Sequence, residues 1–273
     1  MTESFLLIDL SYTIFYRFHA TLNWYKIANK DEEITEDTNL YENIQFKNMF
    51  VKKFYESLEF CIKKNKIPYE HIFVCKDCPR EQIWRNQYKE QYKGNRQGIK
   101  YNGGEFFKLV YTDILPNLIE EKKINKNILE YATLEADDII AITKQYIRKH
   151  FPESFIYIIT SDHDLLQLID DKTYLYNLKK KCINEKSSGD SSVDLQMKIL
   201  CGDKSDNIPQ CFPKCGEKTA LKLIQNPELL KEKLTDPIIY KQYQNNKLLI
   251  DFSMIPTDLH DSFTSYLVKC FQT

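Results

Sequence analysis

The chain has 273 residues, of which 42% are hydrophobic, so it can bury a large core and wholesale disorder is excluded. The formal net charge of -1 indicates no general affinity for polyanions, but such a total can conceal an acidic pocket offset by basic surface. The eight cysteines, and a start that runs into apolar sequence without a signal peptide, predict free thiols in an intracellular protein that is not secreted. No apolar stretch approaches the roughly 20 residues that cross a bilayer, so we expect no membrane association.

Short apolar runs rich in β-forming residues predict strands, and helical stretches separate them. The runs are Phe5–Leu10, Ile72–Cys75 and Phe155–Thr160. Alternation of this kind predicts an α/β fold with a parallel, or largely parallel, sheet flanked by helices. Residues 20–45 are polar and acidic without clear periodicity, and we expect a loop or a small insertion there.

Carboxylates follow each predicted strand. Asp9 closes the first, Asp77 follows the second, and Asp162 and Asp164 follow the third. Ligands of open α/β sheets bind at the carboxyl edge of the strands, so we expect these side chains to face one crevice.

Two further acidic groups border apolar segments. Glu135, Asp137 and Asp138 precede an apolar helical stretch, for which Thr133 is the expected N-cap. These acids have an alternative interpretation, because acidic residues are common in the first turn of any helix. Asp203 and Asp206 form the last group.

Packing so many like charges near buried segments costs free energy unless cations or raised pKa values neutralise them. Oxygen ligands suit Mg²⁺ or Mn²⁺, so these acidic groups predict a site for hard cations. A zinc site built from Cys75 and Cys78 with Cys211 and Cys215 is the weaker alternative, because the outer spacing is long.

The segment from Pro79 to Tyr101 is basic, with six cations against two glutamates and a local charge of +4. If it is helical, its cations form one stripe and its aromatic residues an adjacent one, which suits phosphates and unstacked bases. A surface helix whose aromatic residues pack on the sheet is the alternative. The cationic stripe comprises Arg85, Lys89, Lys93 and Arg96, and the aromatic stripe comprises Trp84, Tyr88 and Tyr92. Four of the seven glycines follow or lie within this segment, and we expect a mobile loop over the acidic crevice.

The chain resembles the flap endonuclease and 5'-3' exonuclease family, which includes phage 5' nucleases, a phage RNase H and the 5'-nuclease domain of DNA polymerase I. The motifs appear in the family's order and cover nearly the whole chain. They are Ile8-Asp9, Tyr92-Lys93-Gly94-Asn95-Arg96, Glu135-Ala136-Asp137-Asp138, Ser161-Asp162-His163-Asp164 and the run from Gly202 to Pro209.

The resemblance implies a structure-specific 5' nuclease with two divalent ions and a PIN-like fold. Its metal carboxylates would be Asp9, Asp77, Glu135, Asp137, Asp138, Asp162, Asp164, Asp203 and Asp206. Lys93 and Arg96 would engage the scissile phosphate, with Arg85, Lys89 and Tyr92 as further DNA contacts. A helix-hairpin-helix over residues 208–224, with Gly216, Lys218 and Thr219 at its core, would grip duplex DNA and could hold K⁺. This hairpin departs from the family pattern, because it contains one glycine where three are usual.

We therefore predict a PIN-like catalytic domain over residues 1–185, with a basic arch over 79–105, and a helical DNA-binding subdomain over 186–273. The expected partner of this monomer is DNA with single-stranded or flap 5' ends, or an RNA–DNA hybrid. A PIN-type ribonuclease is an alternative that the length argues against, because a minimal PIN domain would end near residue 180. A noncatalytic DNA-binding protein is disfavoured because every motif keeps its carboxylates.

Overall fold

The computed structural model describes residues 3–35, 37–88, 92–94 and 101–272. Its centre is a five-stranded sheet with the order β3-β2-β1-β4-β5, in which every neighbouring pair is parallel. The predicted α/β class and parallel sheet are thus confirmed. The strands are β1 (Ser4–Asp9), β2 (Ile72–Cys75), β3 (Ile128–Leu129), β4 (Phe155–Ile159) and β5 (Thr173–Tyr176).

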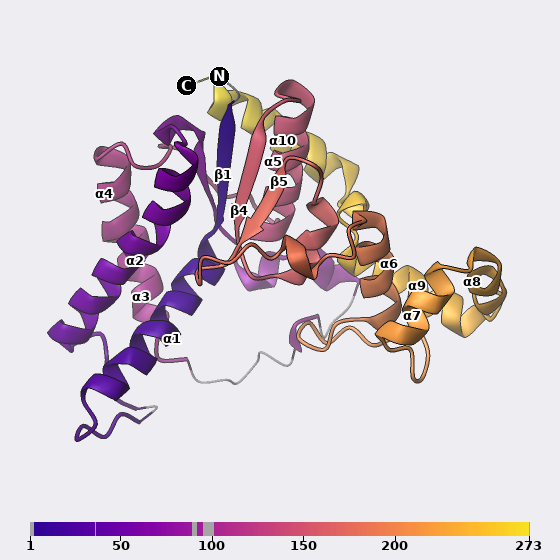
Figure 1. The fold of residues 1–273 in the computed structure, drawn as a ribbon, viewed down its shortest axis with the longest axis horizontal. Helices are drawn as coiled ribbons and strands as arrows, with labels where there is room; N and C mark the ends of the chain where they lie inside the picture. Colours follow the sequence, from indigo (N-terminus) through magenta and orange to yellow (C-terminus); the bar gives the residue numbers. More distant parts are fainter. Residues whose placement is uncertain (1–2, 36, 89–91, 95–100, 273) are drawn as a thin grey trace.

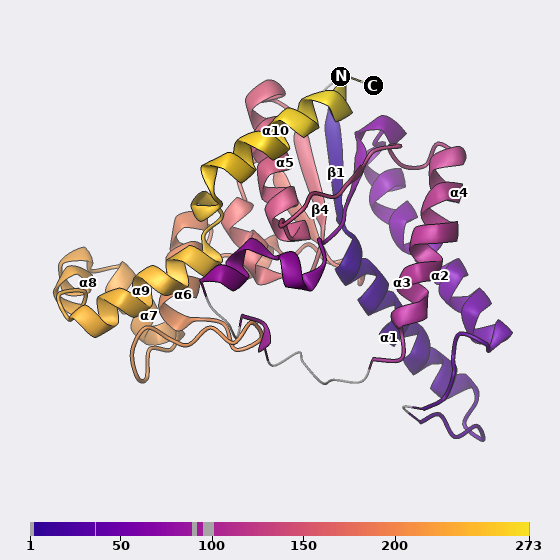
Figure 2. The ribbon, with the colours of Figure 1, turned by 180° about the vertical axis from the view of Figure 1, so that it is seen from behind.

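Helices cover both faces of the sheet (Figures 1 and 2). Successive side chains of a strand point to opposite faces. Phe5 and Leu7 of β1 accordingly join the core formed with α5 and α10, whereas Leu6 and Ile8 join the core formed with α1 and α2. The helices of these two layers are α1 (Leu10–Ala28), α2 (Ile44–Asn65), α3 (Gly104–Leu109), α4 (Leu115–Glu120), α5 (Ala136–His150) and α10 (Thr257–Phe271).

The remaining long helices form a lobe beside the sheet (Figure 1). They are α6 (Ser191–Cys201), α7 (Glu217–Ile224), α8 (Pro227–Lys233) and α9 (Pro237–Ile250). After this lobe the chain returns as α10 to pack on α5, so that the end of α10 lies near the start of β1 (Figure 2).

Short helical turns complete the described chain. They are η1 (Tyr69–His71), η2 (Arg80–Gln82), η3 (Trp84–Gln87), η6 (His163–Leu168), η7 (Asn184–Lys186) and η8 (Phe252–Met254), together with a π-helical turn, η5 (Val110–Ile114), between α3 and α4. No helix in these ranges is both long and apolar enough to cross a membrane.

Two local predictions were wrong. Residues 20–28 belong to α1 rather than to a loop, which begins only after Ala28. The cap of α5 is Glu135, not Thr133: its side chain accepts from the backbone of Asp138, whose carboxylate accepts in return from the Glu135 N–H. This reciprocal arrangement is a capping box and fixes the orientation of both carboxylates.

Candidate active site

Carboxylates from consecutive elements gather at the carboxyl edge of the sheet. Asp9 ends β1 and caps α1, accepting from the Tyr12 N–H at 3.0 Å and from the Thr160 hydroxyl at 3.2 Å. Asp77 follows β2 and accepts from the Ala136 N–H at 2.8 Å, which ties it to the start of α5. The positions of these two side chains are therefore set by backbone groups of neighbouring elements.

The acids after β4 are held by a turn of their own. Asp162 caps η6 and accepts from the Asp164 N–H at 2.8 Å, while its own N–H donates to the Thr160 hydroxyl at 3.0 Å. Because Thr160 also donates to Asp9, one hydroxyl links the acids of β1 and β4.

Burial and repulsion raise the pKa values of two of these acids, Asp9 and Asp137. Burial, and then Asp77 and Asp162, raise the pKa of Asp9 to about 7. Burial, followed by Asp162 and Asp9, raises the pKa of Asp137 well above its usual value. Asp9, Asp77, Asp137 and Asp162 thus lie close enough to perturb one another, and none of them forms an ion pair with a cation of the described residues. We call these four residues the open cluster.

A second set of acids is neutralised by lysines. The ammonium of Lys93 lies 2.6 Å from Glu135 and 3.6 Å from Asp206. That of Lys198 lies 2.7 Å from Asp164 and 2.5 Å from Asp203. Each lysine therefore bridges carboxylates that are distant in the sequence.

The pKa values of this second set reflect these pairs. Burial alone would raise the pKa of Glu135, but Lys93 and Arg85 lower it. Burial and Asp162 raise the pKa of Asp164 to about 7, with Lys198 opposing them. The pKa of Asp203 is lowered despite its burial, because Lys198 and Ser205 donate to it.

Asp138 does not lie where a metal ligand is expected. It is fully buried, and its oxygens accept from the indole of Trp84 at 2.9 Å and from both terminal nitrogens of Arg85 at 2.8 Å. A carboxylate whose oxygens are engaged in this way has no free face for an ion. We therefore correct its assignment from metal ligand to structural anchor.

Arg85 is the partner of Asp138, and its assignment as a DNA contact is corrected in the same way. Only 2% of the side chain is exposed, and it also donates to Glu135 at 3.0 Å and to the Leu249 carbonyl at 2.8 Å. The segment does not form one helix, because Ile83, in extended backbone, separates η2 from η3. Arg85 consequently points into the protein rather than along an exposed cationic stripe.

Tyr92 is buried as well, at 7% exposure, and its hydroxyl donates to Glu135 at 3.2 Å, so it is not available to stack on a base. Lys89 and Arg96, and the part of the glycine-rich loop over residues 95–100, lie outside the described residues. Gly216 precedes α7, and Lys218 and Thr219 lie exposed in its first turn. The predicted helix-hairpin-helix over residues 208–224 comprises the end of the loop that follows α6 and the whole of α7, and its role in binding DNA stays a prediction.

Within the described ranges, no three His, Cys, Asp or Glu side chains lie close enough together to hold a metal ion by themselves. The alternative zinc site is wrong, because Cys75, Cys78 and the Cys211/Cys215 pair lie in three different core clusters. The carboxylates instead line an open edge, where ions could be shared between the protein and a ligand.

The family model of the 5'-3' exonuclease N-terminal resolvase-like domain matches residues 4–196. The chain belongs to the 5'-3' exonuclease family. The predicted family, and with it the class of hydrolase, are confirmed.

Individual relatives agree with the family match. The Ribonuclease H of Enterobacteria phage T4 is 28% identical over 230 residues, which are 77% of this chain and 74% of the relative. The 5'-3' exonuclease of Mycoplasmopsis pulmonis is 32% identical over 209 residues, 72% of this chain and 65% of the relative. The 5'-3' exonuclease of Halalkalibacterium halodurans is 31% identical over 227 residues, which are 75% of this chain and 68% of the relative.

Solved structures of a bacteriophage T5 protein share the fold of this exonuclease-family chain. The protein co-crystallised with metal ions has a TM-score of 0.66 at 17% identity, covering 98% of this chain and 99% of its own. The T5 flap endonuclease in a pseudo-enzyme-product complex with DNA and metal ions has a TM-score of 0.65 at 15% identity, covering 99% and 100%.

Sequence reasoning missed Lys198. The sequence contained a signal for the role of Lys198, because this lysine lies five residues before Asp203 on a helix that leads directly into the last acidic motif. A lysine there can turn back toward the acids, but only the structure shows that it joins Asp164 to Asp203.

Proposed function

We propose that this chain is a divalent-metal-dependent 5' nuclease that hydrolyses phosphodiester bonds in DNA with single-stranded or flap 5' ends. The observation that carries the proposal is the open cluster: its aspartates raise the pKa values of Asp9 and Asp137 and form no ion pair with a cation of the described residues, and divalent ions would offset this repulsion. The T5 flap endonuclease, which has the same fold, was solved with DNA and metal ions, and this supports both the substrate and the ions.

The donor set fits hard cations. Asp9, Asp77, Asp137 and Asp162 offer only oxygen, which Mg²⁺ and Mn²⁺ prefer, and two ions would account for the spread of the acids along the edge. When bound, such ions activate water and neutralise charge on the phosphate and on the leaving oxygen. Asp164, Glu135, Asp203 and Asp206 would then act at the margin of the site, where the lysines already hold them.

In this proposal Lys93, besides pairing with Glu135 and Asp206, also contacts the substrate phosphate. Glu135 and Asp206 hold its ammonium beside the cluster, and its backbone N–H donates to the Asp206 carbonyl at 3.1 Å. Burial alone would lower the pKa of Lys93, but Glu135, Tyr92 and Asp206 raise it well above its usual value. The residue therefore stays charged and can stabilise negative charge on a phosphate oxygen.

Duplex DNA would contact the lobe around α7. Gly216, Lys218 and Thr219 are exposed at the start of this helix, where backbone N–H groups suit a phosphate. We include in the proposal a K⁺ ion at this loop, a monomeric enzyme that works inside the cell, and an RNA–DNA hybrid as a second substrate. The name of the T4 relative, Ribonuclease H, supports the hybrid.

The deciding experiment measures single-turnover cleavage of a 5'-labelled flap duplex with Mg²⁺, with Mn²⁺ and with a chelator. Wild-type protein should cut only with a divalent ion, and Asp162→Ala should lose cleavage while still binding the flap. Asp261→Ala, at an exposed carboxylate, is the matched control and should cut normally.

A single-stranded RNA and an RNA–DNA hybrid of the same sequence complete the series. Full activity of Asp162→Ala, or cleavage in the chelator, would overturn the site assignment. Cleavage of the single-stranded RNA in preference to the flap would instead identify a ribonuclease.

A further inference from the structure

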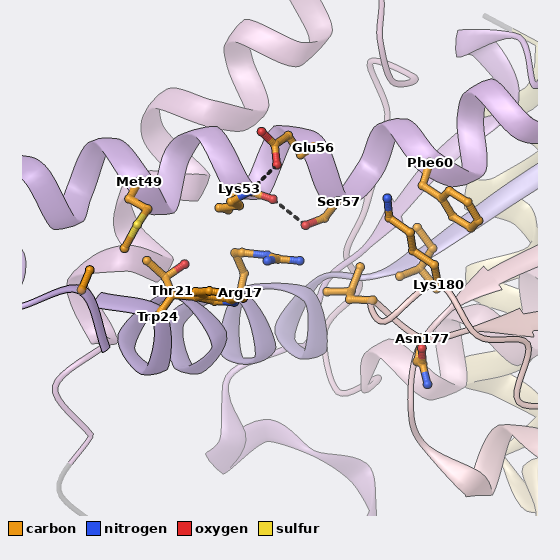
Figure 3. A pocket seen from close by; sticks show the side chains of 13 residues that line it. Arg17, Thr21, Trp24, Met49, Lys53, Glu56, Ser57, Phe60, Asn177 and Lys180 are labelled. Atoms are coloured by element: carbon orange, nitrogen blue, oxygen red, sulfur yellow. Dashed lines mark hydrogen bonds and ion pairs between the residues drawn. The ribbon is translucent and has the colours of Figure 1, made fainter. Parts of the chain in front are cut away.

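A cavity of about 450 Å³ lies between α1 and α2, outside the carboxylate edge (Figure 3). Arg17, Trp24 and Thr21 line it from α1, and Lys53 and Phe60 line it from α2. The cavity falls within the usual range for small-molecule sites, which is roughly 300–1,000 Å³.

Two buried donors beside the cavity have no partner among the residues that the structure describes. The Nε of Arg17 and the Oγ1 of Thr21 are inaccessible to solvent and have no hydrogen-bond partner in the described part of the chain, and Thr21 as a whole is only 1% exposed. Burial lowers the pKa of Arg17, because its guanidinium has lost water without gaining a paired carboxylate. The neighbouring Glu56 is engaged by Lys53 at 2.8 Å. Buried polar groups are normally satisfied, so a small shift of these two side chains toward a ligand in the cavity would give them partners that they lack among the described residues.

The net positive charge of the residues that line the cavity favours an anionic ligand. Arg17, Lys53 and Lys180 against Glu56 leave a formal charge of +2 on the lining. Lys180 comes from the loop after β5, and its ammonium lies 5.1 Å from the ring of Phe60. The lysine run at residues 179–181 thus places one of its members at this cavity, although the run has no role at the active site.

The rest of the lining suits a flat, apolar group. Trp24 is 67% exposed at the rim, and Met49 and Phe60 add apolar surface (Figure 3). Aromatic side chains provide stacking platforms for bases, and a guanidinium is well matched to phosphate oxygens.

The cavity also borders the active site. Ile159, at the end of β4, and Leu178 both line it. The N–H of Leu178 donates to the Tyr12 hydroxyl at 3.0 Å, and Tyr12 in turn donates its N–H to Asp9 at 3.0 Å. The cavity is thus connected to Asp9 of the open cluster through Tyr12 and these two hydrogen bonds.

We propose that this cavity binds a nucleoside monophosphate unit, with the phosphate on Arg17, Lys53 and Lys180 and the base against Trp24. The unit is either a free mononucleotide or one nucleotide of a DNA strand. The choice between these sources rests on the proposed function, whereas the binding itself does not.

The test uses the full chain in a chelator, so that catalysis plays no part. Deoxyadenosine 5'-monophosphate should quench the fluorescence of Trp24, since the other tryptophan, Trp84, is buried. Deoxyadenosine, which lacks the phosphate, and inorganic phosphate, which lacks the base, should each bind more weakly. Lys180→Ala should weaken binding of the mononucleotide about tenfold or more, because a charge-assisted contact is lost.

The matched control is Lys179→Ala, which removes an exposed lysine that does not line the cavity and should leave binding unchanged. Arg17→Gln should weaken binding as well, but it alters a half-buried residue, so its fold is checked by thermal unfolding. No quenching up to about 10 mM mononucleotide, or equal affinities of Lys180→Ala and Lys179→Ala, would overturn the proposal.

A second arm separates the sources by measuring affinity for the uncleaved flap duplex. If the cavity holds a nucleotide of the DNA, Lys180→Ala also weakens flap binding and the mononucleotide competes with the flap. If it holds a free mononucleotide, flap affinity stays unchanged while mononucleotide binding falls. Loss of cleavage in other experiments would refute the nuclease but would leave this binding result intact.

Discussion

Replacing Arg85 with methionine separates a structural role from a DNA contact. The guanidinium is buried and makes two contacts of 2.8 Å with Asp138, one of 3.0 Å with Glu135 and one of 2.8 Å with the Leu249 carbonyl. Removing one partner of a buried ion pair costs about 3–5 kcal/mol, because the other charge stays buried. Glu135 keeps its ion pair with Lys93, so Asp138 is the buried carboxylate that is left without a cation.

Urea unfolding of Arg85→Met should therefore show a free energy of unfolding lower by about 3 kcal/mol or more. Lys231→Ala, which breaks an exposed pair with Glu228, is the control and should change it by less than about 1 kcal/mol. Arg85→Met combined with Asp138→Leu should recover part of the loss, since both charges are then gone. The reasoning is refuted if Arg85→Met unfolds like wild type and only its affinity for flap DNA falls.

Three further outcomes follow from the site. The pKa of Asp9 is raised from 3.8 to about 7, so the folded state binds this proton more tightly than the unfolded state. Without divalent ions, stability should therefore be lost as the pH rises from 3.8 to about 7, and Asp9→Asn should flatten that loss in urea unfolding across this range. Gly202 has a φ of +69°, and an added Cβ would lie 2.5 Å from the Ile208 carbonyl oxygen, so Gly202→Ala should lower both thermal stability and cleavage by displacing Asp203, whereas unchanged values would show that the loop is free to shift. Lys198→Met should lower the Mg²⁺ concentration needed for half-maximal cleavage, because Asp164 and Asp203 would lose their competing ammonium and their repulsion would favour a bound ion; an unchanged or raised Mg²⁺ requirement would contradict this.

The sequence predicted those parts of the fold that depend on continuous apolar runs. β1 and β2 are almost completely buried and β4 is mostly apolar, and all three were identified almost to the residue. β3 contains only two residues, and β5 alternates buried and half-buried residues, so neither strand forms a continuous apolar run. The second half of α1 was missed because its pattern is inverted: Thr21 is buried there while Trp24 is 67% exposed.

The candidate site shows a different limit of sequence reasoning. Residue type and position after a strand were enough to bring Asp9, Asp77 and Asp162 to one edge, because the carboxyl ends of parallel strands share that edge. The pairing of Arg85 with Asp138 spans 53 positions in the sequence. No local pattern could therefore reveal that Asp138, one acid of the Glu135–Asp138 motif, is buried and paired with an arginine.

The distribution of cations therefore matters more than the number of acids. Nine carboxylates suggested one uniform metal cage, yet the protein supplies its own positive charge to those near Lys93, Lys198 and Arg85. Only the open cluster is left without a protein cation among the described residues. Since uncompensated repulsion is what a bound ion relieves, affinity for divalent ions should be concentrated at the ends of β1, β2 and β4, and the lysine-paired acids should tune that affinity rather than create it.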